Sequence, residues 1–332
     1  MPGTKTRPVK KLRKSNRRRF LVTGAAGFIG ANLCRRLVQR GEEVHILVKS
    51  SSVTWRLADI ASKLHVHRAD LTDAPAVERI VGQVRPKVVY HLATHGAYHY
   101  QQDAEKILLV NVLGLWNLVR ASQRVDYELL VNTGSSSEYG VKQFAMRETD
   151  MPDPNSFYAV AKVAQSLLCQ HVGRTGGGTI VTIRPFSVYG PYEEPTRLIP
   201  RLMLAALDDA PIEMVSPRTV RDFIYIDDIV DAYLETEKLK AINGEVINVG
   251  TGLQTDLQQL VATLGKVNGA AIRTKWGTLT ARTWDTQTWL ADISKLRRVL
   301  GSAPRVTLEE GLSRTLSWFR EHHGLYRPSK GK

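Results

Sequence analysis

The chain has 332 residues, 43% of them hydrophobic and 23% charged, which supports a large buried core and excludes fibrous, mucin-like and wholly disordered proteins. Two cysteines, Cys34 and Cys169, are too few for a disulfide framework and lack metal-ligand spacing, so we expect a protein of the reducing cytoplasm with no metal site. The net charge of +14 is concentrated, because residues 1–19 hold nine basic side chains and no acidic one, which leaves +5 for the rest.

Residues 1–18 carry almost nothing apolar that could offset the entropy of ordering, so we expect a disordered basic tail. On composition a transit peptide is an alternative, and contact with nucleic acid or a membrane surface is a less favoured one. A secretory signal is excluded because the apolar residues after the tail are interrupted by glycines. No apolar stretch reaches the roughly 18 residues that a membrane span needs.

A glycine-rich turn follows the first predicted strand. Residues 19–23 form a short apolar run, and residues 31–39 have helical spacing. Between them lies Gly24-Ala25-Ala26-Gly27-Phe28-Ile29-Gly30, where small residues allow a tight turn and a close approach of the backbone to a pyrophosphate at the helix N-terminus. The spacing G-x-x-G-x-x-G differs from the usual G-x-G-x-x-G fingerprint, but its place between strand and helix predicts a dinucleotide site.

The second predicted strand, 43–48, ends without the carboxylate that binds the adenosine ribose of NAD. Lys49 and Ser50 follow it, with Arg56 nearby, and the two cations can pair with a 2′-phosphate. The sequence therefore predicts NADP rather than NAD, the alternative being that both are ordinary surface cations. Asp70, after the third predicted strand, is expected either to accept a bond from the adenine amino group or to be a loop carboxylate.

Predicted strands at 63–67, 87–92 and 129–133 alternate with helical patterns such as 74–84. This alternation is typical of the α/β class with a parallel, doubly wound, Rossmann-type sheet. We expect residues 19–185, with 222–250 returning, to form the cofactor domain. Residues 186–221 and 251–325 are expected to form a smaller substrate-binding lobe.

The strand at 129–133 leads into Ser135, and Tyr158 and Lys162 follow on a predicted helix. Their four-residue separation places Tyr158 and Lys162 on one helical face. A tyrosine with a pKa near its usual value of about 10 is a poor base at neutral pH, so an adjacent ammonium that favours the phenolate is the expected partner. Ser135 would hold a substrate oxygen while Tyr158 exchanges its proton.

In this order the motifs resemble the extended short-chain dehydrogenases/reductases of the NAD-dependent epimerase/dehydratase family, which act on nucleotide sugars. The matching pieces are Gly24-x-x-Gly27-x-x-Gly30, Tyr90-His91-Leu92-Ala93, Asn111-Val112-Leu113-Gly114, Ser135, Tyr158-x-x-x-Lys162, Arg184-Pro185, Val188-Tyr189-Gly190-Pro191, Arg221-Asp222-Phe223 with Asp227-Asp228, and Asn248-Val249-Gly250-Thr251-Gly252. They span residues 20 to about 320.

The resemblance implies that Lys162 also binds the nicotinamide ribose and that Asn111 supports the Tyr158–Lys162 pair through its backbone and water. The remaining implied cofactor-binding residues are Gly24, Gly27, Phe28, Ile29, Gly30, Leu71, Leu92, Ala93, Pro185 and Val188. The implied substrate-binding residues are His95, Tyr98, Ser136, Ser137, Ser187, Arg197, Arg221 and Arg282. Arg221 and Arg282 match positions that clamp the sugar-nucleotide diphosphate, with surface salt bridges as the alternative. The family also implies a homodimer through helices near 105–122 and 158–173.

The residues after Ser135 bear on the reaction. Dehydratases of this family place an acid and a base, usually Asp-Glu, at the positions of Ser136 and Ser137, and hydroxyls cannot replace them without activation. Glu138 is one position late and on an extended segment would point away, although a local bulge could restore it. Dehydration is therefore disfavoured, and the family's C4 epimerases commonly carry the acidic residue after the second strand that this chain lacks.

The leading hypothesis is an NADP-dependent reductase of a nucleotide 4-keto-6-deoxyhexose. An epimerase or a 4,6-dehydratase is the alternative within the family, with His95 or Tyr98 as a second acid or base or merely part of the sugar pocket. A non-catalytic NADP sensor or RNA-binding protein is a remote alternative, because a sensor needs none of Ser135, Tyr158 and Lys162.

Overall fold

The computed structural model describes residues 18–98, 100–280 and 286–326. Two sequence predictions lie outside these residues: the basic tail, apart from Arg18, and the diphosphate ligand Arg282. Within the described ranges, no helix is both long and apolar enough to cross a membrane.

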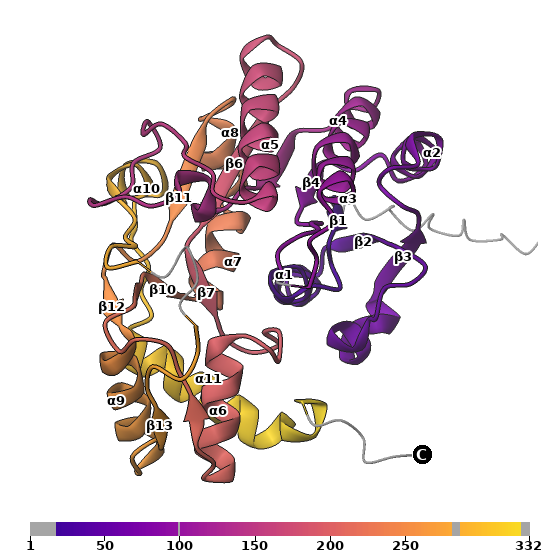
Figure 1. Ribbon diagram of the computed structural model, residues 1–332. Coiled ribbons are helices and arrows are strands. Elements are labelled where there is room, and N and C mark those ends of the chain that lie inside the picture. Colours follow the sequence, from indigo (N-terminus) through magenta and orange to yellow (C-terminus); the bar gives the residue numbers. More distant parts are fainter. Residues whose placement is uncertain (1–17, 99, 281–285, 327–332) are drawn as a thin grey trace, which may run out of the picture.

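A seven-stranded parallel sheet forms the centre of the larger lobe (Figure 1). In spatial order its strands are β11 (Val246–Val249), β6 (Ile180–Pro185), β5 (Leu129–Thr133), β4 (Val88–His91), β1 (Arg19–Thr23), β2 (Glu43–Val48) and β3 (Leu64–Arg68). Strand order reverses between β1 and β4, and such a reversal opens a crevice for ligands at the carboxyl ends of the strands. The predicted α/β class and doubly wound sheet are confirmed.

Both faces of the sheet are apolar because helices cover both. On β1, Phe20 and Val22 pack into one core and Leu21 into the other. One face is covered by α1 (Phe28–Gln39), α7 (Ile226–Leu234) and α8 (Thr236–Lys240). The other is covered by α2 (Ala74–Val84), α4 (Gly114–Gln123) and α5 (Phe157–Arg174). α4 is the last part of a longer continuous helix. This helix begins with α3 (Ala104–Leu108) and continues through the π-helical turn η2 (Leu109–Leu113) into α4.

The smaller lobe is built around helices and three two-stranded sheets, β10–β7, β12–β9 and β13–β8.

The remaining elements of the two lobes, in chain order, are η1 (Trp55–Lys63), η3 (Ser136–Tyr139), β7 (Ser187–Tyr189), α6 (Leu198–Asp208), β8 (Ile212–Glu213), β9 (Val220–Arg221), β10 (Phe223–Tyr225), β12 (Thr255–Asp256), α9 (Leu257–Asn268), β13 (Thr274–Lys275), α10 (Ser294–Leu300), α11 (Leu308–His322) and η4 (His323–Tyr326).

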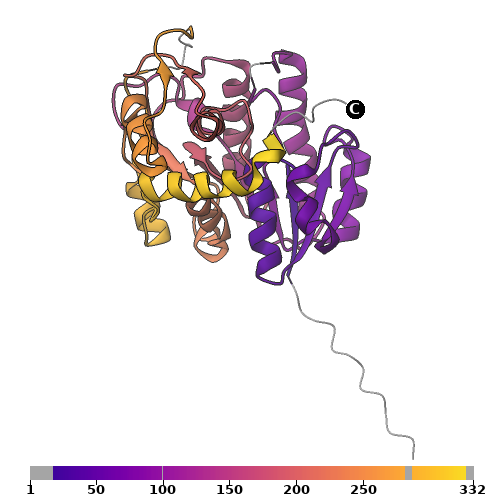
Figure 2. The same cartoon turned by 90° about the horizontal axis from the view of Figure 1, so that it is seen from below.

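The C-terminal helix joins the two lobes. Figure 2 shows α11 running from the smaller lobe toward the cofactor side of the molecule. At its end, the ring of Tyr326 packs edge-on against Trp55, with 5.7 Å between ring centroids. The Tyr326 hydroxyl donates to the carbonyl of Glu193 at 2.7 Å. These contacts hold the loop after β7 against the turn after β2.

Candidate active site

The glycine-rich turn meets the steric demands of a phosphate cradle. Gly24 has a φ of +71°, and a Cβ there would overlap the backbone of Leu92 and Ala93. A Cβ at Gly30 would overlap the Gly24 carbonyl. Gly27 caps α1 with no side-chain bond to the first turn, so the amides of Phe28 and Ile29 face the turn without a competing cap. This helix N-terminus therefore fits a pyrophosphate.

Two residues that we expected to contact different parts of the cofactor pair with each other instead. The Nζ of Lys49 lies 2.7 Å from Oδ2 of Asp70. The amide and hydroxyl of Thr72 both donate to Oδ1 of Asp70, at 3.0 and 2.9 Å. Burial alone would raise the pKa of Asp70, but the bonds from Lys49 and Thr72 hold it below its usual value. Ser50 is exposed in the turn that follows Lys49.

Arg56, which we expected beside the 2′-phosphate of the cofactor, is buried and paired with protein groups. Its side chain is buried and donates to the carbonyl of Tyr192 at 2.7 Å and to Oε2 of Glu194 at 3.0 Å. Its guanidinium also lies over the ring of Trp55, 4.5 Å from the centroid. Arg56 thus fastens η1 to the loop after β7, and its charge is already paired with a carboxylate.

Ser135, Tyr158 and Lys162 lie together beyond the carboxyl end of β5. Ser135 precedes η3, and its hydroxyl lies near the phenol of Tyr158, which is in the first turn of α5. The Nζ of Lys162 is 5.8 Å from the centroid of the Tyr158 ring. Burial raises the pKa of Tyr158, and the nearby Ser135 hydroxyl offsets part of that rise.

Lys162 is held by two neutral oxygens. Its side chain is 1% exposed, and Nζ donates to the Thr133 carbonyl at 2.8 Å and to Oε1 of Gln165 at 3.0 Å. Burial lowers the pKa of Lys162 to about 8, while the charge of Glu138 acts in the opposite direction. The ammonium is thus fixed in place without being neutralised by a directly bonded carboxylate.

A π-helical turn extends this network to Asn111. In a π-helix the hydrogen bonds skip one residue further, a distortion that often accompanies functional sites. Here the carbonyl of Asn111, in η2, accepts a bond from Nε2 of Gln165 at 2.6 Å. The Asn111 side chain exchanges two hydrogen bonds with the backbone of His95, both 2.8 Å long. Asn111 therefore reaches Lys162 through Gln165, where we had expected a water.

His91 closes the network toward the glycine turn. It is fully buried at the end of β4, with Nδ1 at 2.8 Å from the hydroxyl of Thr23 and Nε2 at 3.5 Å from Nε2 of Gln165. Burial and the charge of Lys162 lower the pKa of His91 to about 3, so its imidazole is neutral. A chain of neutral groups, His91 and Gln165, therefore connects Thr23, at the end of β1, with the ammonium of Lys162.

Glu138 faces the core and not the crevice. Residues 136–139 form a 3₁₀ turn, not the extended segment we expected, and Glu138 is fully buried within it. Its Oε2 lies 2.6 Å from Nη2 of Arg184 and accepts a bond from Ser166 at 2.7 Å. Its Oε1 accepts from the Ser135 amide at 2.8 Å. Glu138 thus braces the backbone of Ser135 and is not placed to act as the acid of a dehydration.

The crevice is bordered by residues from both lobes. The guanidinium of Arg197 donates to the Ala97 carbonyl at 2.8 Å and lies 5.3 Å from the centroid of the Tyr98 ring. Its charge also acts to lower the pKa of Tyr158, which places Arg197 near that residue. Arg221 lies over the ring of Trp289, 5.5 Å from the centroid.

The other predicted residues occupy the following positions. Leu92 and Ala93 lie against Gly24, Leu71 is buried beside α4, Pro185 ends β6, Ser187 and Val188 are on β7, Ser136 is buried in η3, and the hydroxyl of Ser137 contacts that of Ser135. Asp227 and Asp228 of the matching motif lie in the first turn of α7.

Comparison with known proteins identifies the family. A model of the NAD dependent epimerase/dehydratase family matches residues 20–250. The chain belongs to this family. It is 29% identical over 323 residues to a UDP-glucuronate 4-epimerase of Thermodesulfobacterium geofontis, covering 94% of this chain and 99% of that one. It is also 29% identical over 325 residues to a dTDP-glucose 4,6-dehydratase of Streptomyces griseus, covering 93% and 96%.

Solved structures of family members also resemble this protein. The UDP-glucuronic acid 4-epimerase of Bacillus cereus, in complex with UDP-glucuronic acid and NAD, superposes with a TM-score of 0.79 at 29% identity, covering 92% of this chain and 99% of that one. Membership makes this chain one of a family of NAD-using nucleotide-sugar epimerases and dehydratases.

The sequence analysis assigned no role to three residues of the network around Lys162: Gln165, His91 and Thr23. Gln165 follows Lys162 by three residues and so shares its helical face, a spacing that could have drawn attention to it. The π-turn at residues 109–113, which contacts α5, leaves no comparable signal in the sequence.

Proposed function

We propose that the protein is a 4-epimerase of a nucleotide sugar, with Tyr158 as the group that moves the proton of the C4 hydroxyl. The observation that carries the proposal is the arrangement around Ser135. A serine, a tyrosine and a buried lysine lie together, while the neighbouring positions offer two hydroxyls and a carboxylate held by Arg184. This set supports proton exchange at one hydroxyl and lacks the acid and base that elimination of water needs.

The chain's own residues would act as follows. Ser135 would hold the C4 oxygen by a hydrogen bond, and Tyr158 as phenolate would take the C4 hydroxyl proton. The same phenol would return that proton to the C4 oxygen after the sugar has turned its other face toward the nicotinamide. Lys162 holds the ribose next to the nicotinamide and stabilises the phenolate through its charge. Gly24, Gly27 and the first turn of α1 would hold the pyrophosphate. NAD, when bound, supplies the hydride acceptor and donor at C4.

For the substrate we favour a UDP sugar, because a similar epimerase has been solved with UDP-glucuronic acid and NAD. Arg197, Arg221 and Arg282 would bind its diphosphate, while Tyr98, His95 and Ser187 would contact the sugar. Residues 19–185 and 222–250 would form the cofactor domain, and residues 186–221 and 251–325 would form the substrate lobe. Both cysteines are free and buried, which agrees with the cytoplasmic location we propose.

A second function, an NADPH-dependent reductase of a 4-keto sugar, rests on one observation. No carboxylate follows β2, and Lys49 and Ser50 stand there instead. In this function Lys49 would leave Asp70 and bind the 2′-phosphate. Tyr158 would then donate its proton to the C4 oxygen once per turnover.

The experiment that separates these functions is stoichiometric. The enzyme is incubated with UDP-glucose, UDP-glucuronic acid, dTDP-glucose or a 4-keto derivative, with NAD or with NADPH, and products are analysed by chromatography and NMR. Epimerisation gives a C4 epimer without net change in absorbance at about 340 nm. Loss of NADPH equal to product would overturn the epimerase proposal and establish the reductase. Formation of a 4-keto-6-deoxy sugar would contradict both.

We also propose a homodimer formed by the helical layer of α3, η2, α4 and α5. Large apolar side chains are exposed along it: Leu109 is 46% exposed and Leu167 is 56% exposed. Together with Trp116 and Leu168, residues of this layer line a shallow apolar groove that a second copy would cover. Sedimentation should give a dimer that Leu167→Glu dissociates, whereas Val66→Glu, at an equally exposed position on β3, should leave it intact.

A further inference from the structure

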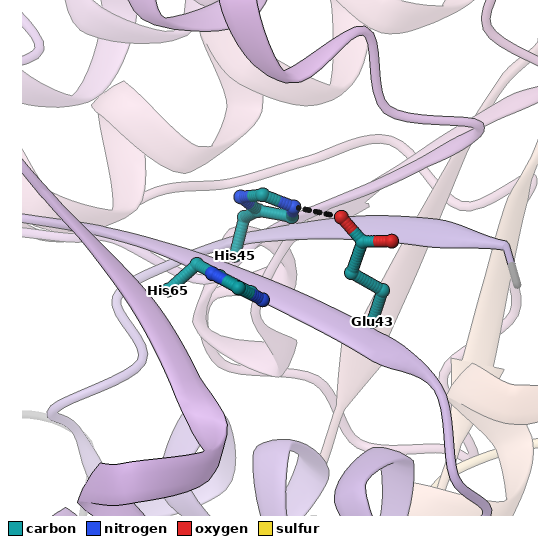
Figure 3. Close-up of side chains that lie close together, drawn as sticks. All are labelled: Glu43, His45 and His65. Carbon is teal, nitrogen blue, oxygen red and sulfur yellow. Dashed lines mark hydrogen bonds and ion pairs between the residues drawn. The ribbon is translucent and has the colours of Figure 1, made fainter. Parts of the chain in front are cut away.

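Three histidines and a glutamate gather at the outer edge of the sheet, away from the crevice. Glu43 and His45 lie on β2, and His65 and His67 lie on β3. The strands run parallel with His45 opposite His65. Because side chains two residues apart share a face of a strand, all four project from the same side of the sheet. Figure 3 shows Glu43, His45 and His65 turned toward one another.

The distances among these side chains suit a shared ion. The candidate ligand atoms of Glu43, His45 and His65 all lie within 4.8 Å of one another. Nε2 of His45 is 3.0 Å from Oε1 of Glu43, and the His45 and His65 rings stack with centroids 4.6 Å apart. Two imidazole nitrogens and a carboxylate oxygen are a common ligand set of catalytic and open zinc sites, in which water completes the coordination.

His67 supplies the outer partner that a metal-binding histidine usually has. Its Nε2 lies 3.0 Å from Nδ1 of His45, the nitrogen that faces away from Glu43. A ligating histidine typically donates its second N–H to such an acceptor, which fixes the ring and its tautomer. His45 is 8% exposed while His65 is exposed, so the inner ligand is held firmly and the outer one is open to solvent.

We propose that Glu43, His45 and His65 form a binding site for a divalent transition-metal ion, with Zn²⁺ as the expected occupant and His67 as the outer hydrogen-bond partner. On binding, Nε2 of His45 exchanges its bond to Glu43 for the metal, and its proton relocates through solvent to Nδ1, which then donates to His67. The ion joins β2 to the edge strand β3 near their amino ends. Lys49 and Asp70 follow the carboxyl ends of the same strands, so the role is stabilising and not catalytic.

Binding is tested with the full chain carrying no affinity tag, stripped with a chelator and titrated with Zn²⁺ against a chromophoric competitor. We expect one Zn²⁺ per chain and a melting temperature that rises with its concentration. His67→Gln should weaken binding by about 10–100-fold. His65→Gln and Glu43→Gln, which remove ligands, should weaken it more. His171→Gln, an exposed histidine on α5, is the matched control and should bind as the wild type does.

Location and folding are checked separately. Because His65 is exposed, His65→Gln without zinc should melt within a degree or two of the metal-free wild type, which separates loss of a ligand from loss of the fold. Anomalous scattering at the zinc edge should place the ion between β2 and β3. Equal zinc affinity in wild type and His65→Gln, or an ion located elsewhere, would overturn the proposal and leave the cluster as a hydrogen-bonded chain of side chains.

Discussion

The region around Tyr158, where we propose proton transfer, and the region after β2, where we propose that the adenosine binds, both lie at the carboxyl ends of the strands of one sheet, yet they hold their charges differently. The ammonium of Lys162 is buried and bonds to neutral oxygens. Lys49 and Arg56 are each paired with a carboxylate, Asp70 and Glu194. In the first region the charge remains available to a ligand, whereas in the second it is already compensated. A cation in a sequence motif therefore indicates a ligand contact only when its protein partners are known.

Tyr158→Phe tests the first region and should have the largest effect. Removing the hydroxyl that exchanges the proton should lower turnover by about 10³-fold, because a positioned general acid or base contributes about 10²–10⁴-fold. Cofactor affinity, measured by fluorescence titration, should change by less than about threefold. Turnover within about tenfold of the wild type would remove Tyr158 from the chemistry.

Arg56→Met tests whether the second region is held by paired charges. It leaves Glu194 without its cation, and breaking such a buried pair costs about 3 kcal/mol of unfolding free energy. Denaturant unfolding provides the measurement, with the exposed Arg40→Met as a control expected to stay within about 0.5 kcal/mol. If stability is unchanged but NADP affinity alone falls more than about tenfold, Arg56 binds the 2′-phosphate after all.

Glu193→Gln extends the comparison of buried charges to Glu193, a buried carboxyl that no cation of the described residues bonds. Burial raises the pKa of Glu193 to about 8, and its Oε2 has no hydrogen-bond partner. In the unfolded state Glu193 has a pKa of about 4.3. Between that pH and about 8 the folded state binds a proton that the unfolded state has released, so wild-type stability falls as the pH rises across this interval.

Glutamine cannot ionise and escapes that loss. The stability of Glu193→Gln relative to the wild type should increase by about 2 kcal/mol between pH 5 and pH 7. The exposed Glu321→Gln serves as the control and should show no such trend. A flat difference for Glu193→Gln would mean that Glu193 is ionised and compensated in the folded protein.

Lys49→Ala should have the smallest effect, and it separates NAD from NADP. Because Lys49 is about half exposed and already paired with Asp70, its removal should change the ratio of NAD to NADP affinities by less than about threefold. Isothermal titration with both cofactors measures this ratio. A selective loss of NADP binding by more than about tenfold would favour the reductase.

The elements with strong periodicity could be predicted closely from the sequence. Strands 19–23, 43–48 and 129–133 and helix 74–84 have the predicted bounds, since each is a local apolar pattern ended by turn residues. The Tyr158–Lys162 pair could be predicted for the same reason, because a four-residue helical spacing is local information.

Interactions between distant residues could not be predicted in this way. Arg56 pairs with Glu194, which lies 138 positions later in the sequence. Glu138 pairs with Arg184, which lies 46 positions later. Neither pairing leaves a pattern in the neighbouring sequence. Glu138 points away from the crevice, as expected, but it does so from a 3₁₀ turn that the three serines before it do not reveal. The route from Asn111 to Lys162 passes through Gln165, which lies 54 positions after Asn111.

The most direct test of the central claim follows the hydrogen at C4. A UDP sugar deuterated at C4 is incubated with the enzyme and NAD, and both epimers are analysed by NMR. Transfer of this hydrogen to the cofactor and back predicts that in H₂O the new epimer keeps its deuterium at C4. In a parallel incubation, an unlabelled UDP sugar in D₂O should gain no deuterium at C4 or C5. Loss of the C4 label to solvent, or exchange at C5, would contradict the account.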